Sequence, residues 1–266
     1  MCSLHSTMNK TTLSREMGVS RGSLYYKSIL DPKDEKLRDQ ILAVLQQHKA
    51  YGHKRIALHL GINKKRVLRV MKKYNITPII QQKKKQSRKG ATSEHFYKNW
   101  LDKLCPIAPD VVWASDFTYI FFQKHWWYLA TIIDVYTREI VGVAFSCYHN
   151  QDLVTSALND ALSQRSIPYY LHSDRGSEYN GHDYTSFATS LGITLSMSPK
   201  GKPWKNGFQE SFYSNFKLEL GSVKHYQTSA DLLEAIYQQL YYYNNKRIHT
   251  ALRMPPSIYA AQHNSS

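Results

Sequence analysis

Cysteine is scarce in this sequence of 266 residues. Cys2, Cys105 and Cys147 lie far apart and form no Cys-x-x-Cys pair, so neither a disulfide framework nor a zinc module is predicted, despite twelve histidines. The sequence also lacks an apolar N-terminal leader, and its longest apolar run, around residues 126–133, is too short to span a bilayer. We therefore expect a reduced, cytoplasmic protein.

Acidic residues are few in the first third of the chain. Residues 1–92 hold 21 Lys and Arg against 5 Asp and Glu, whereas residues 93–266 hold 14 against 15. The whole excess of the net charge of +15 therefore lies in the N-terminal part. A basic segment joined to a nearly neutral remainder indicates a nucleic-acid-binding arm. A solubilising tail is the alternative, and the helical patterning of this segment argues against it.

Two stretches of the basic segment share a pattern. In residues 12–25 and again in residues 57–68, a small residue is followed by a glycine four positions later and by an apolar residue six positions after that. Such spacing predicts a helix-turn-helix, with recognition helices over residues 20–27 and 63–73, although plain helical hairpins would share it. The second helix is the stronger DNA-binding candidate because six cations surround its apolar residues: Lys64, Lys65, Arg66, Arg69, Lys72 and Lys73.

A linker is expected after these helices. Residues 81–90 contain five cations and no apolar side chain that could pack into a core. We expect residues 81–95 to connect a helical DNA-binding region, residues 1–80, to a second domain, residues 96–266, and to lie along phosphates when DNA is bound. The candidate contacts in this linker are Lys83, Lys84, Lys85 and Arg88.

Two aspartates occupy strand settings in the second domain. Residues 111–122 are rich in β-branched and aromatic side chains, and alternation places Asp116 on a largely apolar face with Ala114 and Ile120. An acid in that setting must pair, become protonated or bind a cation. Asp174 follows the short apolar run of residues 168–172, so we expect it at the C-terminal end of a strand, where α/β sheets carry their chemistry.

A glutamate lies on a predicted helix downstream. Over residues 206–220, Phe212, Phe216 and Leu220 recur every four positions as one apolar stripe, and Glu210 and Lys217 fall on the opposite side. A single carboxylate on such a face is ordinarily a solvated charge. Together with two strand-borne aspartates, however, it makes an oxygen-only ligand set that suits Mg²⁺ or Mn²⁺. Two such ions about 3.5–4 Å apart can activate a hydroxyl and stabilise the leaving oxygen of a phosphodiester.

Three blocks of the sequence closely resemble the signature blocks of DDE transposases. They are Trp113-Ala-Ser-Asp116-Phe-Thr-Tyr119, His172-Ser-Asp174-Arg-Gly-Ser-Glu-Tyr179 and Glu210-Ser-Phe-Tyr-Ser-Asn-Phe-Lys217, with 35 residues between the second aspartate and the glutamate. The chain is most similar to the catalytic reading frame, often called OrfB, of two-frame bacterial insertion sequences, and its core resembles that of retroviral integrases. The resemblance runs from about Tyr51 to the C-terminus.

This resemblance implies an α/β fold: an RNase H-like, mixed five-stranded sheet flanked by helices and preceded by small all-α helix-turn-helix modules. It implies that Asp116, Asp174 and Glu210 bind two metal ions and that Lys217 contacts the DNA end. It also implies a homo-oligomer on DNA, associated with the nucleoid, and a protein from an upstream reading frame as partner or fusion. The chain departs from the family at Lys205, where an acid is usual.

The remaining pattern completes the expected sheet and its covering helices. Strands are predicted over residues 126–134, 139–147 and 194–197, and helices over 151–164, 184–191 and 229–245. Asp134 directly precedes a predicted turn and is interpreted as a turn-former. The segment around residues 243–249 and the prolines at 255 and 256 match the family's ending, and His249 is interpreted as structural or DNA-contacting, not catalytic.

The function predicted from these observations is transposition: cleavage of the ends of an insertion sequence and their transfer to target DNA, without a covalent enzyme intermediate. Two alternatives remain open on the sequence. One is a non-catalytic DNA-binding regulator in which the acids are a relic. The other is an RNase H-like nuclease or resolvase, which the two helix-turn-helix units make less favoured.

Overall fold

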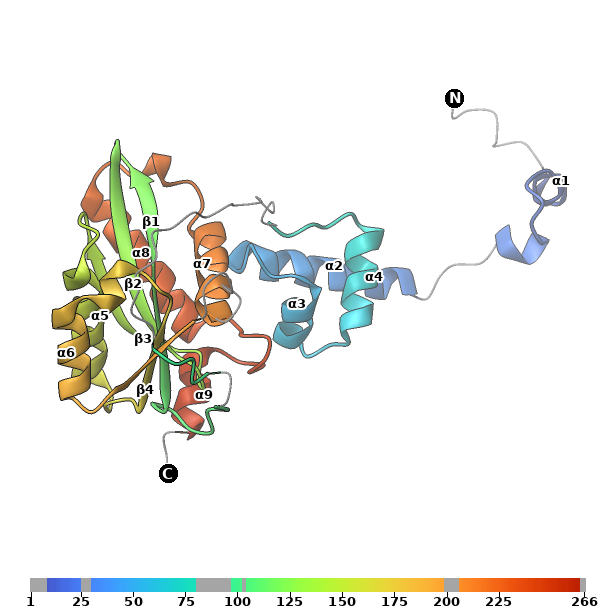
Figure 1. Cartoon of the computed structure of the whole chain (residues 1–266). Helices are drawn as coiled ribbons and strands as arrows, with labels where there is room; N and C mark the ends of the chain where they lie inside the picture. Colours follow the sequence, from blue (N-terminus) through green and yellow to red (C-terminus); the bar gives the residue numbers. More distant parts are fainter. Residues whose placement is uncertain (1–8, 25–29, 80–96, 102–103, 199–205, 264–266) are drawn as a thin grey trace.

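The computed structural model describes residues 9–24, 30–79, 97–101, 104–198 and 206–263 (Figure 1). Its N-terminal part is helical: α1 Lys10–Glu16, the 3-10 helix η1 Arg21–Leu24, α2 Leu30–Gln47, α3 His53–Leu60 and α4 Lys64–Lys73. The remainder contains β1 Val112–Phe122, β2 His125–Asp134, β3 Ile140–Ser146, α5 Gln151–Gln164, β4 Tyr170–Ser173, η2 Ser177–Asn180, α6 His182–Ser190, β5 Thr194–Met197, α7 Gly207–Leu220, η4 Val223–His225, α8 Ser229–Asn245 and α9 Pro256–His263. None of the helices in these described ranges is long and apolar enough to cross a membrane.

The strands form one mixed sheet in the order β3-β2-β1-β4-β5. β1, β2 and β3 run antiparallel as a meander, and β4 and β5 run parallel to β1. Gln123 and Lys124 form the two-residue loop between β1 and β2, with φ of 46° and 65°. Left-handed residues in such a loop match the twist of the strands they join. The predicted mixed five-stranded sheet is confirmed.

Helices cover both faces of the sheet (Figure 1). On one face, α5 and α6 pack over Trp113 and Leu171, and on the other, α7 and α8 pack over Ile120 and Leu129. Gly142 lets α5 approach β3 closely, since a Cβ there would overlap the carbonyl oxygen of Ala157. The central strand β1 is therefore buried from both sides over its first half.

The predicted elements of this domain agree closely with the structure. The helices over 151–164 and 229–245 and the strand over 194–197 have the predicted bounds. The apolar stripe of α7 is confirmed, because Phe212 and Phe216 are buried and Leu220 is partly buried against the same core. Asp134 is confirmed as a turn-former: its carboxylate accepts the backbone N–H groups of Asp110 and Thr137, each at 2.7 Å.

The second predicted unit folds as two helices, α3 and α4, joined by a short turn. α3 ends at Gly61, which has a left-handed φ of 66°, and α4 begins after Asn63, whose side chain accepts the Lys65 N–H at 2.8 Å. α2 completes a small core with these two helices. The first predicted unit has α1, then Gly18 at φ 62°, then only a short 3-10 helix, η1. Residues 25–29, which include the end of its predicted recognition helix, lie outside the described residues.

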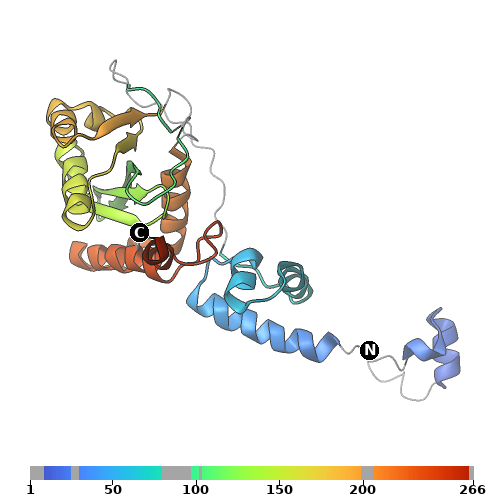
Figure 2. The ribbon, with the colours of Figure 1, turned by 90° about the horizontal axis from the view of Figure 1, so that it is seen from below.

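The α2–α4 module lies against the end of α8 and the segment that follows it (Figures 1 and 2). The Tyr51 hydroxyl accepts the backbone N–H of Ile248 at 2.7 Å, and Arg55 Nε donates to the Ile248 carbonyl at 3.1 Å. His48 is hydrogen-bonded to the Tyr242 hydroxyl at 2.7 Å. These contacts join parts of the chain that are almost 200 residues apart, and they bring the module beside α7.

Candidate active site

Asp116 lies in the middle of β1, opposite Thr131 of β2. Its side chain is half-buried, and Oδ1 accepts the backbone N–H of Phe117 at 2.8 Å. The neighbouring strand β4 pairs with β1 in parallel, with Ala114 opposite His172. Asp116 lies two residues beyond Ala114, and Asp174 lies two residues beyond His172. Asp116 within β1 and Asp174 directly after β4 therefore lie at matching positions along two adjacent strands.

The loop that carries Asp174 is held by its own hydrogen bonds. Asp174 Oδ1 accepts the Gly176 N–H at 2.9 Å, and Arg175 Nε donates to the Ser198 carbonyl at 3.0 Å. His172, directly before this loop, is fully buried, and both of its ring nitrogens are hydrogen-bonded at 2.9 Å, to the hydroxyls of Ser196 and Ser198. His172 is thus a structural residue that ties β4 to β5 just before Asp174.

The environment of the buried Tyr179 hydroxyl indicates that the two aspartates lie near each other. Tyr179 is completely buried, and its hydroxyl lies 3.1 Å from the hydroxyl of Ser115. Burial raises the pKa of Tyr179 well above its ordinary value, and the negative charges of Asp116 and Asp174 both raise it further. Tyr179 therefore stays protonated, and both carboxylates lie within electrostatic range of it.

A buried polar network fixes α7 to the centre of the sheet. Gln209, which has no exposed surface, donates to the carbonyl oxygens of Ala114 at 2.6 Å and Thr131 at 3.0 Å, and accepts the Thr131 hydroxyl at 3.0 Å. One turn later, the Tyr213 hydroxyl donates to the carbonyl oxygen of Asp116 at 2.7 Å. These hydrogen bonds anchor α7 to the backbone of β1 and β2, at the residue before Glu210 and again one turn later.

Gln209 and Tyr213 were not singled out from the sequence. Their separation of four residues places them on one face of a helix, beside the apolar stripe, and that spacing was the available signal. A glutamine between apolar positions of a helix is normally expected at the protein surface. Only its burial against two carbonyl oxygens identifies it as the anchor of α7.

Glu210 is exposed on the first turns of α7. Among the residues that the structure describes, no three His, Cys, Asp or Glu side chains lie close enough together to hold a metal ion. Asp116 and Asp174 fit a hard divalent cation in their chemistry, because each offers carboxylate oxygens whose orientation a backbone N–H fixes. The structure thus brings the two aspartates together and does not gather all three acids into one ligand group.

Lys217 lies further along α7. Its ammonium group is 4.7 Å from the centroid of the Tyr119 ring, a cation–π contact with β1. Tyr119 comes three residues after Asp116 on the same strand. α7 ends at Gly221, so Lys224 lies beyond the helix, as predicted.

The six cations of α4 are all exposed but differ in their contacts. Arg69 donates both Nη groups to the carboxylate of Asp34, at 2.5 and 2.7 Å, and Lys73 Nζ lies 2.6 Å from Asp31 and 3.1 Å from Asp34. The hydrogen bond from Arg69, aided by Lys73, lowers the pKa of the buried Asp34 to about 2. Arg69 and Lys73 therefore hold α4 to α2. The linker candidates Lys83, Lys84, Lys85 and Arg88 lie outside the described residues.

Comparison with known proteins identifies the family that this chain matches. The family described as "Integrase core domain" matches residues 106–203 and, in a second form, residues 191–256. The chain is 35% identical to the transposase for insertion sequence element IS904 of Lactococcus lactis, over 82% of this chain and 90% of that protein. It is 32% identical to the IS600 31 kDa protein of Shigella sonnei, over 88% of this chain and 92% of the relative.

The fold has a counterpart among solved structures. A cryo-electron microscopy structure of a simian T-cell lymphotropic virus intasome, in complex with a regulatory subunit of PP2A, superposes with a TM-score of 0.53. The match covers 84% of this chain and 74% of the viral chain at 16% sequence identity. At that identity the likeness concerns the fold, and it agrees with the predicted RNase H-like architecture.

Proposed function

The chain belongs to the family of bacterial insertion-sequence transposases with an integrase core domain, and we propose that it cuts the ends of its element and joins them to target DNA with Asp116, Asp174 and Glu210 as its catalytic carboxylates. The observation that carries this proposal is the matching position of Asp116 in β1 and of Asp174 directly after the parallel strand β4, together with the packing of α7, which bears Glu210, against β1. The buried anchor formed by Gln209 supports the role of Glu210, because it fixes the start of that helix against β1.

The proposed reaction has two in-line steps at phosphorus. Water first attacks the phosphodiester at the element's end, a new P–O bond forms as the bond to the 3′-oxygen breaks, and a 3′-hydroxyl is released. That hydroxyl then attacks a target phosphodiester, loses its proton, and displaces another 3′-oxygen. Mg²⁺ or Mn²⁺ held by the three carboxylates would supply the activation of the hydroxyl and the neutralisation of charge at phosphorus. No enzyme side chain becomes covalently attached.

The protein's own part is to position the carboxylates. Hydrogen bonds from Phe117 and Gly176 hold Asp116 and Asp174 in fixed orientations, so little side-chain entropy is lost when they engage a cation. Glu210 on the anchored helix completes the set in this proposal. Lys217 follows on the same helix and would contact the phosphates of the cut end.

DNA binding is proposed for the exposed cations of α4, in a helix-turn-helix whose second helix enters the major groove. Lys64, Lys65, Arg66 and Lys72 are the candidates for contacts to DNA, while Arg69 and Lys73 are engaged by acids of α2. Because an element has two ends and each copy of the chain carries one set of three carboxylates, we further propose a homo-oligomer on DNA. An upstream-frame partner remains a prediction.

The test is incubation of the full chain with the element's own end DNA and Mg²⁺, followed by analysis of cut and joined strands. Asp116→Asn, Asp174→Asn and Glu210→Gln are each expected to abolish both products and to leave DNA binding largely intact. An amide keeps the shape of the side chain but removes the charge that holds the metal. Glu234→Gln, an exposed acid of α8, is the matched control and should keep full activity.

The products also separate the alternatives. Cut ends without joined strands would indicate a nuclease, and binding without cleavage would indicate a regulator. If any one of the three variants kept cleavage close to that of the wild type, that residue would have to leave the catalytic set.

A further inference from the structure

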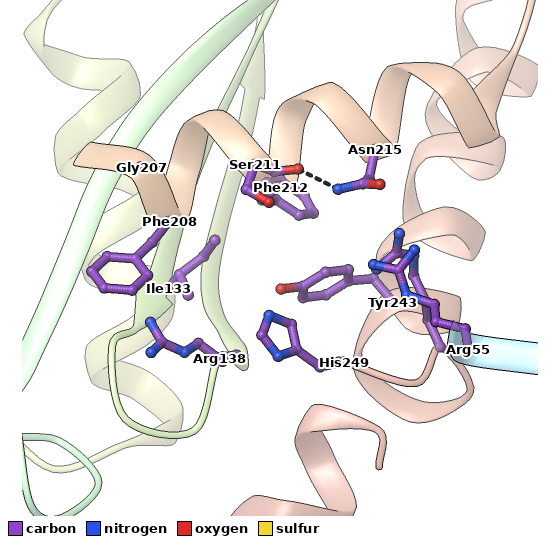
Figure 3. Close-up of a pocket in the computed structure, with 11 residues that line it drawn as sticks. Arg55, Ile133, Arg138, Gly207, Phe208, Ser211, Phe212, Asn215, Tyr243 and His249 are labelled. Atoms are coloured by element: carbon purple, nitrogen blue, oxygen red, sulfur yellow. Dashed lines mark hydrogen bonds between the residues drawn. The ribbon is translucent and has the colours of Figure 1, made fainter. Parts of the chain in front are cut away.

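A pocket of about 360 Å³ lies on the side of α7 that faces the helical module (Figure 3). Four segments that are distant in the sequence meet around it: α3, the turn between β2 and β3, the first half of α7, and the end of α8 with the residues that follow. Three of these segments contribute Arg55, Arg138, Arg247 and His249, and we call the cavity that these residues line the arginine pocket. Figure 3 shows Arg138 extending toward Phe208 of α7, while the ring of His249 lies near Arg138 and Tyr243.

Several donors in the arginine pocket are buried without a hydrogen-bond partner among the described residues. They are Nε and Nη1 of Arg138 and Nη2 of Arg247; the ring nitrogen Nδ1 of His249 is buried there without a partner as well. The side chain of Arg247 is only 2% exposed, and its Nε is bound to both carboxylate oxygens of Glu219, at 2.7 and 3.0 Å. Buried donors are normally satisfied, so several unsatisfied ones around one cavity indicate a missing acceptor.

The pocket also has an excess of positive charge. Burial lowers the pKa of Arg55 and of Arg138, and the charge of Arg247 lowers that of Arg55 further. Burial, followed by the charges of Arg138, Arg247 and Arg55, lowers the pKa of His249 to about 4. The acids nearby are already engaged, Glu219 by Arg247 and Asp134 by its turn. The imidazole is therefore neutral at neutral pH, and three guanidinium groups dominate the potential.

Arg138 is held toward the pocket at a conformational cost. Its φ of 64° is left-handed, which a residue with a side chain adopts only when its surroundings require it. Its guanidinium group stacks 4.1 Å from the centroid of the Phe208 ring, at the start of α7. The guanidinium is thus oriented before any ligand binds, which reduces the entropy lost on binding.

We propose that the arginine pocket binds a phosphodiester group of a DNA strand. Guanidinium groups match phosphate oxygens geometrically, and an anion would satisfy the buried donors and the positive potential together. The choice of DNA as the source of the phosphate rests on the proposed function. Ser211, which lines the pocket, directly follows Glu210, so a strand held there would run beside the helix of the proposed active site. In this proposal Arg138 contacts the phosphate directly.

The test measures binding without metal, so it is independent of the proposed chemistry. A fluorescent hexathymidylate is titrated with the full chain, and its anisotropy is compared with that of a methylphosphonate hexamer, which lacks the phosphate charge. Arg138→Gln is expected to weaken binding of the charged hexamer by about tenfold or more, the usual effect of losing a hydrogen bond to a charged group. Arg138→Lys, which keeps the charge, should lose less. Arg38→Gln, an exposed charge paired with Asp39 in α2, is the control and should bind like the wild type.

Three results would overturn the proposal. The first is equal affinity of Arg138→Gln and wild type for the charged hexamer. The second is equal affinity of the wild type for the charged and the methylphosphonate hexamers. The third is binding of inorganic phosphate that depends on Arg138 while binding of the hexamer does not, which would make the pocket a site for free phosphate. If Arg138→Gln failed to fold, the wild type would still decide, since it should melt at a higher temperature with the charged hexamer than with the methylphosphonate hexamer at equal ionic strength.

Discussion

Gln209 offers a direct test of how α7 is held on the sheet. Gln209→Met replaces a fully buried amide with an apolar side chain of similar length and volume, so the core stays filled. The substitution removes three hydrogen bonds: those to the carbonyls of Ala114 and Thr131, and that from the Thr131 hydroxyl. It also leaves these partners buried with fewer contacts.

The expected loss follows from those three bonds. A buried hydrogen bond between neutral groups contributes about 1 kcal/mol to stability, so the variant should lose about 3 kcal/mol. For a domain of this size, each kcal/mol lowers the melting temperature by about 2–4 °C, which gives a fall of roughly 6–12 °C. Strand cleavage should fall as well, because Glu210 is the next residue of the helix.

Thermal melting followed by near-ultraviolet circular dichroism measures this effect, since that signal reports the packing of aromatic side chains. Gln238→Met is the matched control, because it makes the same chemical change at an exposed position of α8, where surface substitutions change stability by about 0.5 kcal/mol or less. If Gln209→Met melted together with the wild type and with Gln238→Met, the buried network would not be what secures α7.

Lys217→Ala should slow strand transfer from pre-cut ends relative to Lys224→Ala, because only Lys217 lies on the helix of Glu210; equal rates would leave it as a surface charge. Removing residues 1–92 should weaken DNA binding and flatten its dependence on salt, because fewer counterions are released, and unchanged salt slopes would contradict this. Since its pKa is lowered from 3.8 to about 2, Asp34 stabilises the helical module above its ordinary pKa, and this contribution is lost as the pH falls through about 2. Helical circular dichroism of Asp34→Asn should therefore change less than that of the wild type in acid, and superposable curves would count against the role of the Arg69 pair.

Helix caps and apolar spacing, which depend on residues close together in the sequence, predicted the helices and strands of the second domain well. The helix over 151–164 begins after Asn150, whose side chain accepts the Leu153 N–H, and the helix over 229–245 begins with a capping box formed by Thr228 and Asp231. Apolar spacing then identified the buried faces. The first helix-turn-helix stays a prediction, since η1 covers only part of its second half and residues 25–29 lie outside the described residues.

The sequence by itself determined which acids of the second domain lie in or directly after strands and which lie on a helix. Alternation in one strand and the end of another singled out Asp116 and Asp174, and parallel pairing of β1 with β4 then brings them to matching positions. Alternation and apolar spacing depend only on near neighbours in the chain, so they are readable before the fold is known. The oxygen-only ligand set already suggested Mg²⁺ or Mn²⁺, and the family resemblance added the expectation that Asp116, Asp174 and Glu210 act as one metal-binding triad.

The tertiary structure alone decided which polar groups from distant segments meet. Gln209 became the anchor of α7 because packing buried it against two carbonyl oxygens of the sheet. Arg69 remains exposed on α4 but forms an ion pair with Asp34 of α2. Arg138 and Arg247 converge on one pocket although 108 positions separate them in the sequence. A hydrogen-bond partner far along the chain leaves no periodic trace, because long-range pairing depends on how whole elements pack and not on the residues beside each group.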